Sequence, residues 1–173
     1  LTEINLSMNF LKCLLFFVGL LILSRLIPHP PNFTPLIAGA VFLPFLLKDK
    51  RLVIGLPISI LLISDLIIGL HNTLLWTYGA FLLIGLTVFT YTKQNLKNLL
   101  SLAVVSPTIF YVLTNFGVWL TSSLYMKSFA GLVECYVLAI PFYANSLLST
   151  ILFSALFYAV WQLVLKKGLI QQA

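Results

Sequence analysis

Charged residues are scarce in this sequence: they make up 8% of it, whereas hydrophobic residues make up 61%. A soluble domain cannot cover its surface with so few charges, so the composition predicts a polytopic membrane protein. At roughly 20 apolar residues per span, the chain has room for one integral membrane domain, residues 1–173, an all-α bundle of about six transmembrane helices. Met8 looks like a natural start, and residues 1–7 are expected to be upstream or added residues without a role.

Several catalytic and metal-binding patterns are missing. There is no GxxxxGK[ST] loop for ATP, no HExxH and no GxSxG, so we expect no enzymatic activity. Cys13 and Cys135 are the 2 cysteines of the chain and form no CxxC, which argues against a structural disulfide, a metal site or a bound cofactor. The net charge is +6, but the basic residues are scattered between apolar segments, which is typical of topology signals and not of nucleic-acid binding.

A proline-rich elbow, Arg25-Leu-Ile-Pro-His-Pro-Pro-Asn-Phe-Thr-Pro35, separates two apolar segments. Its prolines fix φ and withhold backbone N–H groups, so residues 28–35 are expected to be neither helix nor strand. Irregular backbone at membrane depth is tolerated only where it is buried in protein or faces a watery cavity. The elbow, with Arg25, His29 and Asn32, is therefore the first candidate site.

Apolar runs predict membrane spans at residues 8–27, 34–47, 52–70, 74–91, 99–120 and 137–165. Residues 121–136 are expected to form a connection, partly in the membrane interface. With six spans, most basic residues fall on the side of the termini, and the positive-inside bias predicts that both termini are cytoplasmic. The run 34–47 is short and carries two prolines, so a re-entrant segment is the alternative. In that case the elbow moves to the cytoplasmic face.

Asp65 is the strongest single polar signal, because a carboxylate inside a transmembrane helix costs about 2.5–3.5 kcal/mol. It needs a partner or water. A contact to a ligand or ion, a position at the interface, and a structural pair with Arg25 are the interpretations left open. Glu134 is expected to be a solvated loop residue, with a role as second carboxylate as the minor alternative.

The remaining candidates are amides, a histidine and aromatic rings. His29, Asn32 and Asn115 suit the orientation of a polar solute, but such residues are also common in turns and caps. Trp119, Tyr136, Phe142 and Tyr143 suit stacking on a flat ring or anchoring at the interface. The predicted ligand-binding residues are Arg25, His29, Asn32, Asp65, Asn115, Trp119, Tyr136, Phe142 and Asn145.

The elbow, Ser64-Asp65 with Gly69, Thr114-Asn-Phe-Gly-Val-Trp119 and Cys135-Tyr136 with Ile140-Pro-Phe142 resemble a family of small uncharacterised bacterial membrane proteins. That family is similar to the substrate-binding S components of energy-coupling factor (ECF) transporters. The resemblance covers most of residues 25–145. It implies a six-helix protein of the bacterial inner membrane, with cytoplasmic termini and an outer cavity for a vitamin or vitamin precursor.

The same resemblance implies a transmembrane coupling subunit and ATPases as partners, besides the solute and the lipid bilayer. S components often carry Ala-x-x-x-Ala in the first helix, and residues 10–26 lack it. The leading hypothesis is a solute-binding component of a nutrient uptake transporter. One alternative is a membrane enzyme that uses His29 with Asp65 or Glu134 as acid and base. Another is an accessory subunit that assembles through Ala155-x-x-x-Ala159, a seam that intramolecular contact would also explain.

Overall fold

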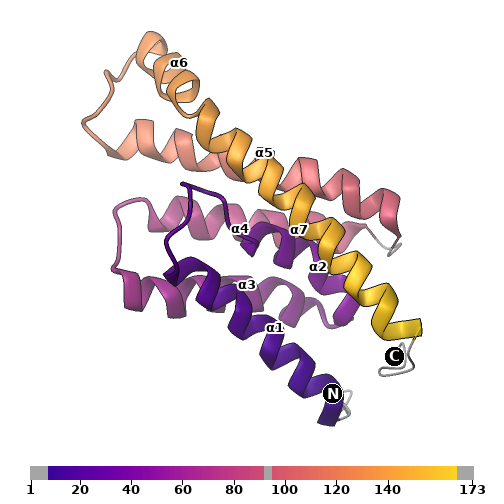
Figure 1. Cartoon of the computed structure of the whole chain (residues 1–173). Coiled ribbons are helices and arrows are strands. Elements are labelled where there is room, and N and C mark those ends of the chain that lie inside the picture. The colour runs from indigo at the N-terminus through magenta and orange to yellow at the C-terminus, as the bar shows by residue number, and fades with distance from the viewer. Residues whose placement is uncertain (1–7, 92–94, 167–173) are drawn as a thin grey trace.

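The chain forms a bundle of seven α-helices in the computed structural model, which describes residues 8–91 and 95–166 (Figure 1). The helices are α1 (Met8–Leu26), α2 (Leu36–Leu46), α3 (Lys50–Ile68), α4 (Leu74–Thr90), α5 (Leu96–Thr121), α6 (Phe129–Leu138) and α7 (Ile140–Lys166). Within the described residues, 3 helices are long and apolar enough to cross a membrane, namely α3, α5 and α7. These helices indicate an integral membrane protein of the helical-bundle type.

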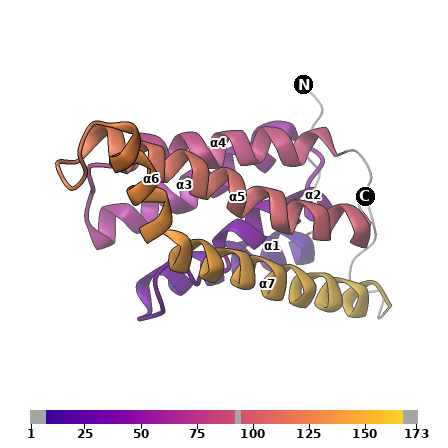
Figure 2. The same cartoon turned by 90° about the horizontal axis from the view of Figure 1, so that it is seen from above.

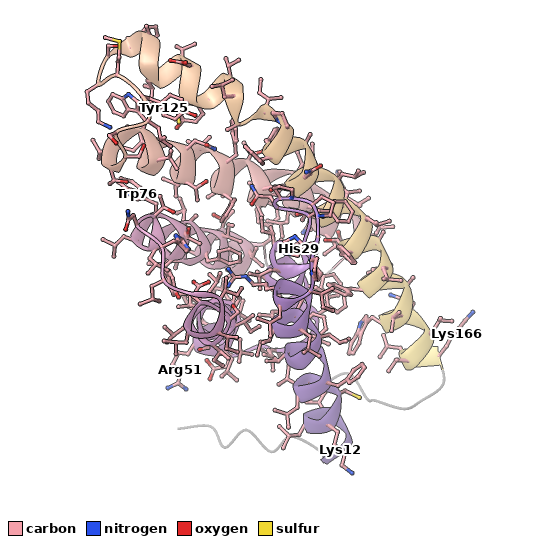
Figure 3. All side chains as sticks on the ribbon, turned by 60° about the vertical axis from the view of Figure 1, so that its left-hand side comes forward. Lys12, His29, Arg51, Trp76, Tyr125 and Lys166 are labelled. Atoms are coloured by element: carbon pink, nitrogen blue, oxygen red, sulfur yellow. The ribbon has the colours of Figure 1, made fainter. Side chains whose placement is uncertain are left out.

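The connections between helices gather at two ends of the bundle. One end, which we call the elbow end, carries the elbow, the α3–α4 turn and the α5–α6 loop (Figures 1 and 2). The other, the terminal end, carries the start of α1, the α2–α3 connection and the end of α7. Lys12, Arg51 and Lys166 lie toward the terminal end, whereas Trp76 and Tyr125 lie toward the elbow end (Figure 3).

Local signals set the helix boundaries, and the predicted spans agree with α1–α5 and α7 to within 3 residues at each end. The prolines of the elbow stop α1, because they cannot donate the next backbone hydrogen bonds. Gly69 ends α3 with φ 115°, a conformation that suits glycine, and its N–H donates to the Asp65 carbonyl at 2.8 Å. Asp49, Asn95 and Ser128 cap the N-termini of α3, α5 and α6 through their side chains.

Helix α2 is the short, buried centre of the bundle. It has 11 residues, about 16 Å of helix, which is half the thickness of a hydrocarbon core. Its residues 36–43 are buried, and it contacts α1, α3, α4, α5 and α7. A Cβ added at Gly39 would lie 2.6 Å from the Leu21 side chain, so α1 and α2 are close here. The expected helix is confirmed, and it returns the chain from the elbow end to the terminal end.

The predicted connection at residues 121–136 is wrong in part, because it contains most of α6. The charged residues Lys127 and Glu134, with Gly131 between them, suggested a loop. In the structure Ser128 accepts from the Gly131 N–H at 3.2 Å and starts a helix that runs to Leu138, immediately before α7. The apolar residues of this segment therefore belong to a short helix beside α5.

On helix α7 the polar side chains are mostly buried, and the large apolar side chains are mostly exposed. Its buried residues include Ser146, Ser149, Thr150 and Ser154, whereas many of its large apolar side chains are exposed. This is the pattern expected of a membrane helix, whose apolar face meets lipid and whose small residues permit close contact with other helices. Ala155 and Ala159 are exposed, so the interpretation of this seam as intramolecular contact is wrong.

Candidate functional site

An ion pair joins α1 to α3 near the elbow end. Arg25 Nη2 lies 2.8 Å from Asp65 Oδ1, with side-chain exposures of 17% and 1%. Tyr78 on α4 donates its hydroxyl to Asp65 Oδ2 at 3.0 Å, and Arg25 Nη1 also donates to Ser64 Oγ. A buried carboxylate is tolerated only with such partners. The structure therefore has the Arg25–Asp65 pair that the sequence allowed as one interpretation.

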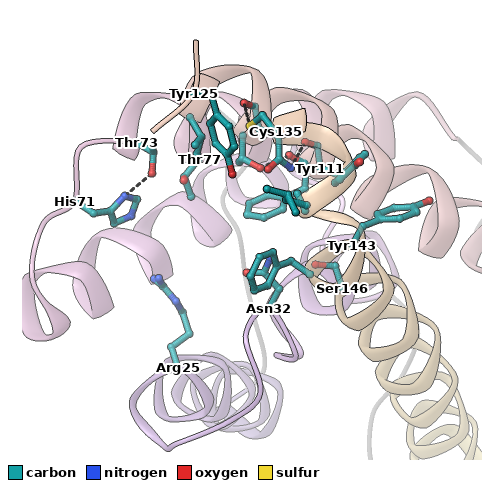
Figure 4. A pocket seen from close by; sticks show the side chains of 17 residues that line it. Arg25, Asn32, His71, Thr73, Thr77, Tyr111, Tyr125, Cys135, Tyr143 and Ser146 are labelled. Carbon is teal, nitrogen blue, oxygen red and sulfur yellow. Dashed lines mark hydrogen bonds between the residues drawn. The ribbon is translucent and has the colours of Figure 1, made fainter. Parts of the chain in front are cut away.

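Two adjoining cavities lie at the elbow end, with volumes of about 420 Å³ and about 280 Å³. Both are of a size suited to small ligands or parts of them. Their linings share Arg25, Asn32, Thr77, Phe110 and Ser146, so they form one site with two lobes. Side chains of the first lobe come from the elbow, the α3–α4 turn, α4, α5, α6 and α7 (Figure 4). The elbow therefore shares its face of the bundle with the α3–α4 turn.

The elbow is folded back on itself and tied to α7. Asn32 has φ 60°, a left-handed conformation that asparagine tolerates better than most residues. Phe33 N–H donates to the Pro30 carbonyl at 2.9 Å, and His29 Nδ1 lies 2.8 Å from that same oxygen. Asn145 Nδ2 donates to the Pro31 carbonyl at 3.0 Å. Asn145 thus holds the elbow against the bundle.

An aromatic wall of α5 and α7 closes the first lobe. The rings of Tyr111 and Tyr143 have centroids 4.8 Å apart, and their hydroxyls bond the Tyr136 carbonyl at 2.6 Å and Thr108 Oγ1 at 2.9 Å. Asn115 Nδ2 donates to the Tyr111 carbonyl at 2.8 Å, which leaves its amide oxygen for another donor. The wall therefore offers flat apolar faces beside a few fixed polar atoms.

The cavity walls carry basic but no acidic side chains. Within the described chain, no Asp or Glu lines either lobe. Asp65 is buried in its ion pair with Arg25, Glu134 is exposed, and neither belongs to the linings. Arg25 and His71 line the first lobe (Figure 4), and Arg25 and His29 line the second. Within the described residues, the walls thus offer no carboxylate to a cation.

Five of the nine predicted ligand-binding residues line the cavities, namely Arg25, His29, Asn32, Asn115 and Phe142. The other four lie outside the linings and have other contacts. Asp65 binds Arg25, and Asn145 binds the elbow. Trp119 Nε1 donates to the Met126 carbonyl at 3.0 Å, and Tyr136 donates its hydroxyl to the Val112 carbonyl at 2.6 Å. Trp119 therefore holds the α5–α6 loop, and Tyr136 holds α6 on α5.

Sequence reasoning missed several residues of the site, above all Thr77, Tyr111 and Ser146. Hydroxyl residues at intervals of three or four positions along α7 were the available signal for Ser146, since they mark one helix face. Thr73 and Thr77 have the same spacing on α4. Both patterns lie in strongly apolar segments, where serine and threonine also serve helix contact.

The comparisons with known proteins identify a family but assign no activity to it. Residues 5–172 match a family of unknown function, DUF6580, and the chain belongs to that family. No curated protein and no solved structure matches the chain. The residues of the site are therefore what indicates a function.

Proposed function

We propose that this protein is the solute-binding membrane component of a nutrient uptake system, and that the solute occupies the two-lobed cavity at the elbow end. The observation that carries the proposal is the lining of that cavity, to which six parts of the chain contribute polar or aromatic side chains. Aromatic rings beside fixed polar groups in one concave site suit the binding of a small polar molecule. A vitamin or vitamin precursor is the proposed kind of solute.

The proposal also specifies the membrane that holds the protein and the orientation of the protein in it. The protein would lie in the bacterial inner membrane with both termini in the cytoplasm and the elbow end outward. Basic side chains at the terminal end, including Lys12, Lys48 and Lys166, support this orientation. A coupling subunit and ATPases would supply energy, because the sequence has no ATP-binding loop of its own. The exposed Ala155 and Ala159 offer a small-residue surface on α7 for such a subunit.

The acid–base alternative has less support in the geometry. Asp65 is 1% exposed and already binds Arg25 and Tyr78, so it has no free contact with a substrate. His29 lies in the second lobe, and Glu134 lies outside both linings. A general base must reach the proton that it abstracts. Binding without reaction is therefore the function that these positions favour.

A thermal-stability screen tests the proposal directly. The purified protein is heated in detergent with a panel of water-soluble vitamins and precursors, and at least one compound is expected to raise Tm. Phe142→Ala removes an exposed ring from the cavity wall and should abolish that rise. Leu148→Ala, at a residue of the same helix that is 60% exposed and outside the linings, is the matched control. A panel without any effect would contradict the proposal.

Cysteine labelling in intact cells tests the orientation. In a background of Cys13→Ser and Cys135→Ser, His29→Cys is expected to react with a membrane-impermeant thiol reagent added outside. Lys48→Cys, at an exposed residue of the terminal end, should react only after the cells are opened. The reverse result would put the cavity on the cytoplasmic side and remove the uptake interpretation.

A further inference from the structure

The N-terminus of the buried helix α2 lies at the wall of the second lobe. Leu36 and Ile37, its first two residues, line that lobe together with Thr34 of the elbow. The first backbone N–H groups of a helix have no partner within it, and Pro35 at the N-cap gives no side-chain hydrogen bond. Helix N-termini carry a partial positive charge that favours anions, and half-helices inside membrane proteins use it for anionic solutes.

Two buried hydroxyls point to the same place independently. Ser146 on α7 is 2% exposed, Thr77 on α4 is 8% exposed, and both line both lobes. Within the described residues, neither side-chain hydroxyl makes a hydrogen bond. Among the described residues, the fully enclosed hydroxyls without a partner are those of Ser106 and Ser154, so the unbonded hydroxyls of Ser146 and Thr77 reach the cavity surface, where their donors are available to a bound group. Figure 4 shows Ser146 close to Asn32 in the wall of the cavity.

The charges around this point select between possible solutes. The linings contain Arg25 and two histidines and, as far as the structure describes the chain, no carboxylate. Asp65 neutralises much of the Arg25 charge, but at 1% exposure it is covered and is not among the lining residues. A cation would meet the paired Arg25 guanidinium and, within the described linings, no accessible carboxylate. An anion would meet a helix N-terminus, two free hydroxyl donors and the outer side of Arg25.

We infer that the solute carries a carboxylate, bound at the N-terminus of α2 between Ser146 and Thr77. This inference rests on the proposed function and names the chemical class of its solute. The aromatic wall of Tyr111 and Tyr143 adjoins the carboxylate site through Phe110, which lines both lobes. A flat ring attached to the carboxylate would stack there. The solute class is thus an aromatic or heteroaromatic carboxylic acid.

Matched acid and amide pairs test the inference on the full protein in detergent. The probes are benzoate with benzamide and pyridine-3-carboxylate with pyridine-3-carboxamide, at equal ionic strength. Calorimetric titration should give each acid an affinity about tenfold or more above that of its amide, because hydrogen bonds to a charged group are roughly twice as strong as neutral ones. Acetate alone should bind more weakly than benzoate, since it lacks the ring.

A pair of serine variants links the effect to the cavity. Ser146→Ala should weaken binding of the acids about tenfold and leave the amides nearly unchanged. Ser154→Ala is the matched control, because Ser154 is also a buried, unbonded serine of α7 but lies outside both linings. The Ser154 variant should bind the acids as the unchanged protein does. Equal losses in the two variants would overturn the assignment of the carboxylate to Ser146.

The possible results separate this inference from the proposed function. If the amides, or vitamins without a carboxylate, bind as well as the acids, the carboxylate class is wrong while solute binding stands. If no probe and no vitamin of any charge binds, both the inference and the proposed function fail. Acid binding that Ser146→Ala leaves intact would place the carboxylate elsewhere and overturn the inference.

Discussion

The two ends of the bundle differ in what fills the space between the helices. At the terminal end, rings of α1, α2 and α7 meet: Phe17 and Phe157 have centroids 5.0 Å apart, and Phe42 contacts Phe45 and Trp161. At the elbow end, the elbow and helices from α2 to α7 enclose two cavities with polar walls. Close aromatic contact at the terminal end favours stability, whereas open space with unbonded hydroxyls at the elbow end costs stability.

Helix α2 belongs to both regions. Its first residues line the second lobe, and Phe42, nearer its other end, lies in the aromatic cluster. The aromatic cluster therefore fixes the position of the helix whose N-terminus we assign to the carboxylate. The difference between the two ends implies a division of roles, in which one end sets stability and the other sets binding.

Removal of an aromatic ring from the terminal end should have the largest effect. Phe42→Ala should lower the free energy of unfolding by about 3 kcal/mol, because Phe42 is 3% exposed and leaves a large cavity. Thermal unfolding in detergent measures the loss. The carboxylate affinity of the protein that remains folded should change less than in Ser146→Ala. If Phe42→Ala lowered the free energy of carboxylate binding more than the free energy of unfolding, the proposed division of roles between the two ends would be wrong.

The next effect concerns the ion pair that borders the cavity. Asp65→Leu should cost about 2 kcal/mol, less than the roughly 3–5 kcal/mol typical of a broken buried pair, because Arg25 is 17% exposed and reaches water. The double variant Arg25→Leu/Asp65→Leu should recover part of this loss, since no unpaired charge remains. Thermal unfolding of the two single variants and the double variant gives the coupling energy. Strictly additive losses would show that the pair has no structural role.

The elbow should respond to a change of backbone conformation alone. Asn32→Val places a β-branched residue at φ 60°, which should cost about 1–2 kcal/mol and weaken solute binding through a displaced elbow. Asn32→Gly removes the same amide but accepts the conformation. Near-normal stability with weakened binding in the glycine variant would assign a role to the amide, and normal binding would assign the role to the backbone.

Much of the fold could be predicted from the sequence because membrane spans have a strong compositional signal. Helices α1–α5 and α7, the proline elbow and the possible pair of Asp65 with Arg25 follow from apolar runs, missing N–H groups and the cost of a buried carboxylate, and three of these helices are long and apolar enough to cross a membrane. Helix α6 was missed because its compositional signal is weak. Gly131 and Glu134 within its ten residues, and Lys127 just before them, concealed a short apolar helix whose start depends on the Ser128 cap.

The site was less predictable, because its main features depend on helix orientation about each axis. The spacing of hydroxyl residues along α7 marks one helix face, but it does not show that this face meets a cavity at Ser146 while Ala155 faces outward. Trp119, Tyr136 and Asn145 look like binding residues, yet in the structure they hold the α5–α6 loop, α6 and the elbow. Polar and aromatic residues near a site can therefore support it without lining it.

The smallest expected effect lies at the terminal end, far from the cavity. Asp49 caps α3 by accepting from the Arg51 N–H at 2.8 Å, and the Arg51 side chain also binds it, so its pKa is lowered. A lowered folded pKa means that the stabilisation is complete above the unfolded pKa, about 4, and is lost as the pH falls through the folded pKa. Asp49→Asn keeps the cap and removes the charge.

Thermal unfolding between pH 7 and pH 3 should show a small loss of Tm on acidification that Asp49→Asn reduces. Asp49→Ala should also lower Tm slightly at neutral pH, because it removes the cap. Binding of benzoate at neutral pH should be the same in both variants, since Asp49 lies at the end opposite the cavity. A change in binding at Asp49 would show that the two ends are coupled, and the division of roles between them would then be wrong.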